Sequence, residues 1–234
     1  KYVDIDRLLE LTKQVAPAAL PMSVSHRTYR REPSFTVAIA RDPAFNFMYE
    51  ANIRYLHHLG EVTYFSPLAD TSLPDTGFVY LPGGYPELYL AALSANRPML
   101  QSIRRYVENG GKLLAECGGM MYLCDEIRDK NGDVYPMAGV LHQSATMENM
   151  KLRLGYRTLL YNETRLKGHE FHYSRLVEQQ NPLPSCAVAY TAKGVETDTP
   201  LYHYKNVWAG YTHLYWADPV GNEWFTKFVI DGNT

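Results

Sequence analysis

Cys117 is the residue whose position best suits covalent chemistry. Residues 112–115 have the apolar pattern of a short strand, and Gly118 and Gly119 open an apolar helical segment, so the cysteine lies between a strand and a helix. A nucleophile on such a turn needs small neighbours, because the turn brings the flanking residues close together. The free N–H groups and the dipole at a helix start lower the pKa of a thiol, so the sequence predicts a reactive thiolate. A buried, purely structural cysteine is the alternative.

A pair of glycines, Gly83 and Gly84, follows the strand predicted over 78–81. Ligands of an open parallel sheet bind at the carboxyl ends of its strands, where Cys117 also lies. A cysteine that attacks an amide carbonyl creates an oxyanion, which two backbone N–H groups can hold. We predict that Gly84 or Gly83 supplies one of these groups and Gly118 the other. The alternative is that the glycine pair only forms a tight turn.

A cysteine nucleophile also needs a base, and the chain has eight histidines. His213 ends the last apolar strand, which is where a fold with a nucleophile on a strand–helix turn places its base. We predict His213 as the base and keep His172 as the alternative. His169 and His172 have the spacing of a helical metal pair, but their segment has the pattern of a strand and offers no third ligand. No metal site is therefore predicted.

Alternating strands and helices must position these residues. Strands are predicted over 35–40, 62–65, 78–81 and 112–115, and helices over 47–59, 86–94, 98–108 and 222–230. This alternation predicts an α/β fold with an open, mostly parallel sheet flanked by helices, of the flavodoxin-like kind. Further β-rich segments follow at 137–147, 152–161, 168–177, 185–192 and 207–212. We expect them to extend the sheet with antiparallel strands.

The first part of the chain has a different pattern. Residues 4–15 have the spacing of an amphipathic helix, and a segment with three prolines precedes the first strand. We therefore divide the chain into residues 1–34 and a domain over 35–234 that holds the candidate site.

Composition narrows the function classes. The 234 residues carry a net charge of −2, so no nucleic-acid footprint is expected. The sequence shows no membrane span and no signal-peptide pattern, and three cysteines are too few for a disulfide framework. A reducing, cytoplasmic location is predicted.

Seven segments in order carry a family resemblance. They are Val-Ala-Ile-Ala-Arg-Asp-Pro-Ala-Phe-Asn-Phe at 37–47, Phe-Ser-Pro-Leu at 65–68, Pro-Gly-Gly-Tyr-Pro-Glu-Leu at 82–88, Ala-Glu-Cys-Gly-Gly-Met-Met-Tyr-Leu at 115–123, Leu-Gly-Tyr-Arg at 154–157, Gly-His-Glu-Phe-His-Tyr-Ser at 168–174 and Tyr-Thr-His-Leu at 211–214. The chain resembles class I glutamine amidotransferase domains of the cobalamin-pathway type, in particular the carboxy-terminal part of the cobyrinic acid a,c-diamide synthase family.

The resemblance implies a glutaminase in which Cys117 attacks the glutamine side-chain amide and His213 moves the proton. It implies that ammonia passes to a synthetase domain, where ATP and Mg²⁺ activate a corrin carboxylate. The acceptors would be the a- and c-acetate groups of cobyrinic or hydrogenobyrinic acid. No cofactor is expected within this chain, and a homodimer is left open.

The chain departs from the family pattern in two places. Many class I amidotransferases carry a Glu two residues after the catalytic histidine, and this chain has Tyr215 there. Glu116 is adjacent to the cysteine, but strand alternation should point its side chain away from it. The second departure is that no GxxxxGK[ST] loop occurs, so we interpret the chain as a carboxy-terminal fragment whose residues 1–34 end the synthetase domain.

Three alternatives stay open at this point. One is the glutaminase domain of cobyric acid synthase, and another is that of a different tetrapyrrole amidase. The third is a non-catalytic amidotransferase-like domain that only docks to a synthetase. The segment around His172 could also couple the two domains of the enzyme.

Overall fold

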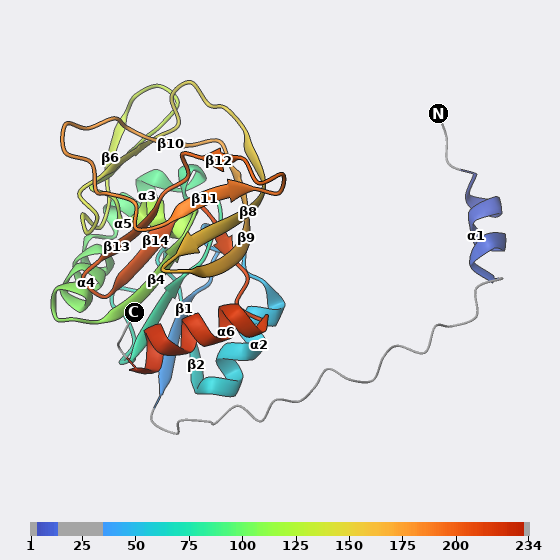
Figure 1. Ribbon diagram of the computed structural model, residues 1–234. Coiled ribbons are helices and arrows are strands. Elements are labelled where there is room, and N and C mark those ends of the chain that lie inside the picture. The colour runs from blue at the N-terminus through green and yellow to red at the C-terminus, as the bar shows by residue number, and fades with distance from the viewer. Residues whose placement is uncertain (1–3, 14–34, 232–234) are drawn as a thin grey trace. The chain divides into compact units, whose positions relative to one another are not determined.

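The computed structural model describes residues 4–13 and 35–231 (Figure 1). Helix α1 (Ile5–Lys13) agrees with the helix predicted over 4–15, and none of its residues is buried. The helix is described by itself. The predicted linker falls within 14–34, outside the described residues, so the domain boundary at residue 34 stays a prediction.

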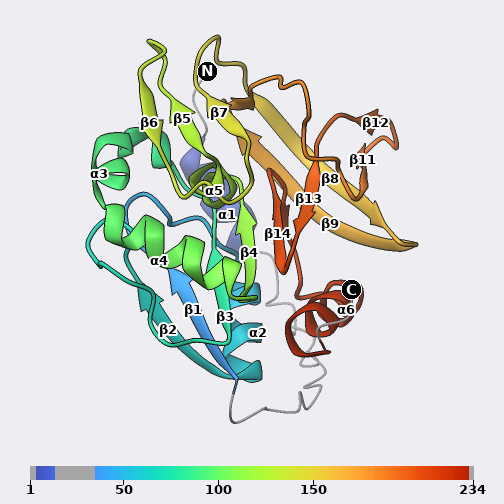
Figure 2. The same cartoon turned by 90° about the vertical axis from the view of Figure 1, so that its left-hand side faces the viewer.

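A six-stranded sheet lies at the centre of the domain (Figure 2), in the order β13-β14-β4-β3-β1-β2. Its strands are β1 (Thr36–Ala40), β2 (Glu61–Phe65), β3 (Phe78–Leu81), β4 (Lys112–Glu116), β13 (Leu201–Tyr204) and β14 (Val207–Gly210). All neighbouring strands in it are parallel except the edge pair of β13 and β14. The predicted α/β fold class is therefore confirmed, and β3 and β4 bring Gly83 and Cys117 to the same edge of the sheet.

Helices cover both faces of this sheet. They are α2 (Glu50–Leu59), α3 (Leu90–Ala95), α4 (Arg97–Glu108), α5 (Gly118–Leu123) and α6 (Pro219–Thr226). Figure 2 shows α3 and α4 on one side of the sheet and α2 and α6 on the other. Strand alternation explains the two layers: Phe78 packs into the cluster that contains α2 and α6, and Val79 packs into the cluster that contains α3 and α4.

Three predicted helices differ in their bounds. Helix α2 begins at Glu50 instead of 47, because the Phe47 N–H donates to the Gly83 carbonyl at 3.0 Å and keeps that segment extended. The helix predicted over 86–94 is a 3₁₀ turn (Pro86–Leu88) followed by α3. Helix α6 begins earlier than 222, because the Asp218 carboxylate caps it through the Gly221 N–H at 2.7 Å.

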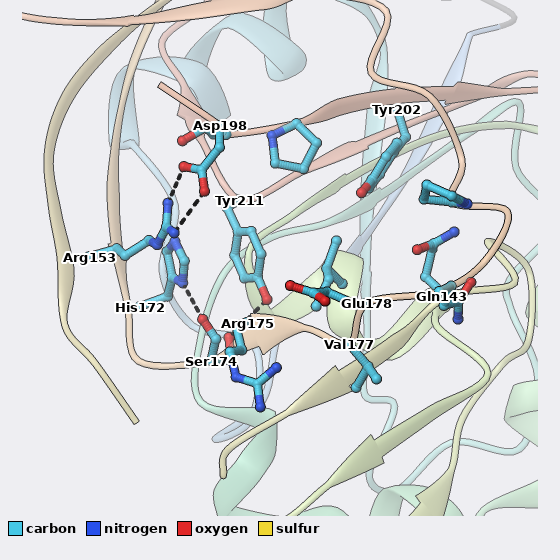
Figure 3. A pocket seen from close by; sticks show the side chains of 15 residues that line it. Gln143, Arg153, His172, Ser174, Arg175, Val177, Glu178, Asp198, Tyr202 and Tyr211 are labelled. Carbon is cyan, nitrogen blue, oxygen red and sulfur yellow. Dashed lines mark hydrogen bonds and ion pairs between the residues drawn. The ribbon is translucent and has the colours of Figure 1, made fainter. Parts of the chain in front are cut away.

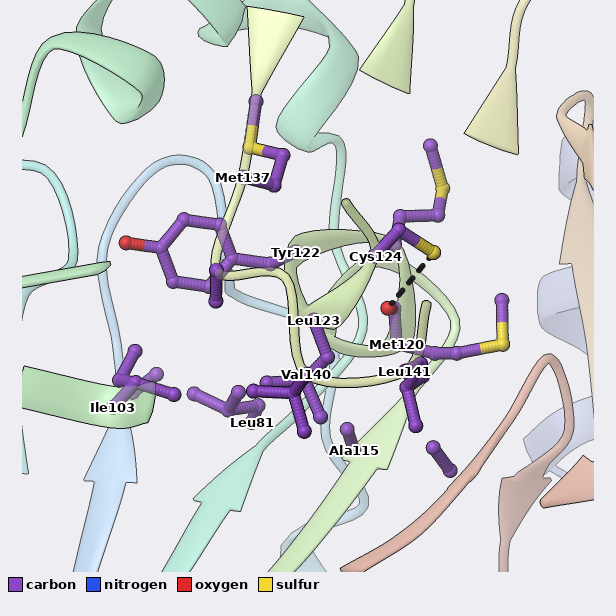
Figure 4. Close-up of a cluster of buried hydrophobic side chains, with 14 of the residues drawn as sticks. Leu81, Ile103, Ala115, Met120, Tyr122, Leu123, Cys124, Met137, Val140 and Leu141 are labelled. Atoms are coloured by element: carbon purple, nitrogen blue, oxygen red, sulfur yellow. Dashed lines mark hydrogen bonds between the residues drawn. The ribbon is translucent and has the colours of Figure 1, made fainter. Parts of the chain in front are cut away.

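The core beneath the Cys117 turn is built from both strands and helices (Figure 4). Leu81 and Ala115 come from the sheet, Ile103 from α4 and Leu123 from α5, and all four are fully buried. Cys124 lies in the same cluster, and its thiol donates to the Met120 carbonyl at 3.6 Å. Cys124 is therefore a core residue.

The second half of the domain does not simply extend the central sheet. Its strands are β5 (Glu126–Arg128), β6 (Val134–Pro136), β7 (Ser144–Thr146), β8 (Arg153–Tyr161), β9 (Thr164–His172), β10 (Arg175–Leu176), β11 (Val188–Thr191), β12 (Glu196–Thr197) and β15 (His213–Leu214). They form a four-stranded sheet, β10-β7-β5-β6, and a five-stranded sheet, β12-β11-β8-β9-β15. The antiparallel strands expected in the second half are present, but only β13 and β14 extend the central sheet, and β14 does so parallel to β4. For the other strands the expected extension of that sheet was wrong. The reason is the β8–β9 hairpin, whose nine residues a side pair with each other.

No helix in the described part of the chain is long and apolar enough to cross a membrane.

Candidate active site

Cys117 lies on the predicted turn between β4 and α5, and the turn is strained. Its φ of 50° and ψ of −106° are values that a residue with a Cβ rarely adopts, and such strain costs about 1–3 kcal/mol. The Cys117 N–H donates to the Gly210 carbonyl at 2.8 Å and fixes the turn to β14. Gly119 is required here, since a Cβ on it would lie 2.1 Å from the Leu81 carbonyl oxygen. Close packing around Cys117 keeps its backbone in this strained conformation.

The Cys117 thiol is buried and neutral at rest. Its side chain is 4% exposed, and Sγ donates a long hydrogen bond of 3.9 Å to the Phe171 carbonyl. Burial, and then the charge of Glu87, raise the pKa of Cys117 to about 12, while the Gly118 N–H lowers it by less. The lowered pKa expected from the helix start was therefore wrong, because removal of water outweighs the dipole of a short helix. Such a thiol needs a base.

His213 lies on β15 of the five-stranded sheet, and its ring reaches Gly83 just beyond the end of β3. This strand pairs with β9, which sets the His213 ring against His169 in a stack with 5.0 Å between ring centroids. The Phe47 ring packs edge-to-face against the His213 ring, with 4.5 Å between the ring centroids. Gly83 touches the imidazole directly, since a Cβ on it would lie 2.1 Å from Cε1 of His213. Gly83 therefore makes room for the histidine.

Burial also determines the charge of His213. Desolvation, and then the nearby His169 and His172, lower the pKa of His213 to about 3, which keeps the ring neutral. Its Nδ1 atom is buried and has no hydrogen-bond partner in the structure. A neutral imidazole has a free lone pair, but the same burial makes His213 a weak base. Transfer of the thiol proton to it therefore requires a change in its surroundings, such as the binding of a substrate.

The lowered pKa of His213 predicts a specific dependence of stability on pH. A histidine that is neutral in the folded state contributes stability above its unfolded pKa of about 6.5, and this is lost as pH falls toward 3. Between pH 7 and pH 4 the free energy of unfolding of the native protein should fall. We expect this fall to be about 3 kcal/mol smaller in His213→Gln. Urea unfolding of both proteins at the two pH values measures this. An equal pH dependence in both would contradict the buried, neutral imidazole.

His172, the alternative base, has both ring nitrogens engaged. Its Nδ1 donates to the Ser174 carbonyl at 2.9 Å, and its Nε2 lies 3.9 Å from the Glu170 carboxylate. The ring stacks on Tyr211 with 3.8 Å between centroids. His172 also lines the Cys117 pocket. These contacts give His172 a place in the wall of the pocket. His213 is not among the residues that line it, and its role as the base stays a prediction.

The pocket at Cys117 is nearly closed. It holds about 10 Å³, close to the volume of a single water-sized sphere, so a larger molecule can enter only when the lining moves. Gly84 and Glu87 contribute to its lining. The Gly84 and Gly118 backbones lie side by side, since a Cβ on Gly118 would lie 3.2 Å from the Gly84 nitrogen. The two glycines proposed for the oxyanion thus meet beside the thiol.

A larger cavity adjoins this pocket (Figure 3). It holds about 570 Å³ and shares His172 and Ser174 with the Cys117 pocket. Arg153 and Asp198 form a two-point ion pair in its wall, and the Ser174 hydroxyl donates to the Tyr211 hydroxyl at 3.2 Å. Two pairs of polar side chains therefore lie in the wall of this cavity.

Comparison with known proteins decides the family. The model of the CobB/CobQ-like glutamine amidotransferase domain matches residues 36–220. The chain belongs to this family. The glutamine amidotransferase domain is 37% identical over 224 residues to hydrogenobyrinate a,c-diamide synthase of Stutzerimonas stutzeri, a match that covers 92% of this chain and 51% of that protein. It is also 37% identical over 232 residues to cobyrinate a,c-diamide synthase of Dehalococcoides mccartyi strain 195, covering 92% and 49%. The chain thus spans about half the length of these curated relatives.

Solved structures support the fold of this glutamine amidotransferase domain. A crystal structure of a glutamine amidotransferase matches with a TM-score of 0.54 and 16% identity, over 82% of this chain and 98% of the other. The PurLQS structure from Thermotoga maritima matches with a TM-score of 0.53 and 17% identity, over 76% and 87%.

Sequence reasoning missed three neighbours of the predicted residues in this amidotransferase domain. Phe47 and His169 pack on the His213 ring. Glu116 points away from the thiol as expected, but its Oε2 lies 4.0 Å from His213 Nδ1. Strand alternation predicts the face of the sheet on which Glu116 lies. It does not predict that β15 passes beside that face. His169 and His172 lie on opposite faces of β9, because three residues along a strand reverse the side.

Proposed function

We propose that this domain hydrolyses glutamine through a thioester on Cys117. The observation that carries the proposal is the meeting of three groups at the carboxyl edge of the central sheet. These are a thiol on a strained turn, a neutral imidazole packed on Gly83, and the adjoining backbones of Gly84 and Gly118. A glutamine amide is a substrate that these groups suit, since its cleavage needs a nucleophile, a base and an oxyanion site.

The proposed reaction begins when His213 Nε2 takes the thiol proton as Sγ bonds to the amide carbon. The carbonyl electron pair moves to oxygen, where the Gly84 and Gly118 N–H groups stabilise the charge. When the carbonyl re-forms, the C–N bond breaks and His213 gives its proton to the leaving nitrogen, which departs as ammonia. Water then attacks the thioester, His213 takes the water proton and returns it to Sγ, and glutamate is released. The base must move the proton in each half-reaction, because the buried thiol does not ionise by itself.

Glu87 suits recognition of the other end of glutamine. Its carboxylate lines the Cys117 pocket, and burial raises its pKa. We infer that it pairs with the α-ammonium group of the substrate, which would restore the charge balance of the pocket.

The names of the relatives suggest where the ammonia goes. Both are a,c-diamide synthases that act on cobyrinate or hydrogenobyrinate, and this chain spans about half of each. We infer that ammonia passes to an ATP- and Mg²⁺-dependent synthetase domain, which amidates the a- and c-acetate carboxylates of the corrin. Joined to such a domain, the protein should form the diamide in the presence of glutamine and ATP. Amidation of other corrin side chains alone would point to cobyric acid synthase instead.

Covalent labelling tests the glutaminase proposal. A glutamine analogue that carries a diazoketone in place of the side-chain amide alkylates the thiol that attacks this group. Peptide mass spectrometry then locates the adduct. We expect one adduct, on Cys117, and protection by excess glutamine. An adduct on Cys124 or Cys186 would contradict the site, and no adduct together with no glutamate release would favour a non-catalytic docking domain.

A further inference from the structure

His213 lacks the residue that usually holds a catalytic imidazole. Many class I amidotransferases carry a Glu two residues after the histidine, and here Tyr215 takes that position, is 37% exposed and packs edge-on against Tyr49. His213 Nδ1 is nevertheless buried and without a hydrogen-bond partner. An unpaired Nδ1 leaves both the tautomer and the orientation of the ring undefined.

A carboxylate from another strand faces this nitrogen. Glu116, the last residue of β4, is 2% exposed and places Oε2 4.0 Å from His213 Nδ1. The Leu214 N–H donates to its Oε1 at 3.0 Å, which ties the carboxylate to the residue directly after the histidine. A shift of about 1 Å would bring Oε2 and Nδ1 to hydrogen-bond distance, and such distances commonly shorten when substrate binds.

The carboxylate itself is held in place. The Tyr80 hydroxyl on β3 donates to Glu116 Oε2 at 2.7 Å. Burial raises the pKa of Glu116 to about 8, against the lowering effect of the donors from Tyr80 and Leu214. The other titratable groups that interact with this pair are Tyr49, Cys117, His169, Glu170 and His172. Among them, Glu170 is already paired with Arg157 at 2.9 Å.

We propose that Glu116 is the positioning residue of His213 and takes the place of the missing Glu. This inference rests on the proposed glutaminase function. In its ionised form, which prevails above pH 8, Glu116 accepts the Nδ1–H of His213, so the lone pair lies on Nε2, where the thiol proton is received. When His213 becomes an imidazolium, the same carboxylate stabilises its charge and the Nδ1 proton stays on the ring. The group that orients the base thus ends β4, directly before the nucleophile on the following turn.

The substitution Glu116→Gln tests this with little change in volume. The amide oxygen can still accept the Leu214 N–H, so the amide nitrogen takes the place of Oε2 and donates to Nδ1. His213 is then expected to carry its hydrogen on Nε2, which removes the base. We expect kcat for glutamine hydrolysis to fall about 10²-fold or more, with KM little changed.

Nitrogen-15 NMR of histidine-labelled protein reads the tautomer directly. The His213 signals are assigned by their loss in His213→Gln, and the native protein should show hydrogen on Nδ1 and Glu116→Gln hydrogen on Nε2. Tyr80→Phe is the matched control: it disturbs the same network but keeps the carboxylate, so His213 should keep its hydrogen on Nδ1. If Glu116 were purely structural, Glu116→Gln and Tyr80→Phe would lose the same fraction of kcat. The His213 tautomer would then be the same in both variants and in the native protein.

The NMR result does not depend on turnover. If the native protein is not labelled at Cys117 by the glutamine analogue, the glutaminase proposal fails while the tautomers still report on the Glu116–His213 contact. If labelling occurs but Glu116→Gln keeps its hydrogen on Nδ1 and a kcat within about threefold of the native value, the positioning proposal is overturned.

Discussion

Replacing Cys117 with alanine is expected to reduce glutamate formation to background, a fall of at least about 10³-fold. No other described residue that lines the pocket carries a thiol, so none can form the thioester. The others are a glycine, a carboxylate, three aromatic rings, a methionine, His172 and Ser174. Glutamate release by the protein joined to its synthetase domain is the measurement. The thermal unfolding midpoint should change little, since alanine keeps the Cβ and the turn.

Cys124→Ala is the matched control for this loss. Cys124 is fully buried in the cluster between the sheet and the helices, away from the pocket lining. Its removal leaves a small cavity, so we expect about 1–2 kcal/mol of destabilisation with glutaminase activity retained. Activity that survives in Cys117→Ala but is lost in Cys124→Ala would move the nucleophile to the core cysteine.

Gly83→Ala is the second substitution with a large expected effect. The added methyl group would overlap Cε1 of His213 at 2.1 Å, so the imidazole must move away from the thiol. A displacement of about 1 Å in a catalytic group can lower a rate 10²-fold, and we expect at least that loss in kcat. Steady-state kinetics with glutamine measures it, and circular dichroism checks that the domain still folds.

Gly77→Ala is the control for the glycine substitution. It lies just before β3, where an added Cβ would have its nearest neighbour, the Thr36 carbonyl oxygen, at an ordinary 3.6 Å. Activity near the native level is expected. If Gly83→Ala is equally active, the ring of His213 does not need the position that the structure gives it, and the base must be sought elsewhere.

The elements that carry the site could be predicted because their signals are local. The apolar run of β4 and the glycines of α5 lie within a few residues of Cys117, so composition alone indicates a strand–turn–helix. The glycine pair after β3 is equally local. The family assignment follows from these segments in their order, and the comparisons confirm it.

Long-range features could not be predicted from the same patterns. The pKa of Cys117 depends on burial by β9 and on Glu87, neither of which is near it in sequence. The separate five-stranded sheet depends on which strand pairs with β9, and strand patterns do not specify partners. The approach of Glu116 to His213 requires β15 to pass beside β4, a contact between residues far apart in the chain.

The closed pocket has a chemical consequence for the lifetime of the enzyme. A thiol enclosed in about 10 Å³, with its pKa raised to about 12, carries almost no thiolate at neutral pH. Peroxides oxidise thiolates rather than thiols, and they also need access to the sulfur. If Cys117 is the nucleophile that we propose, the same burial that makes it depend on a base would also slow its oxidation between turnovers.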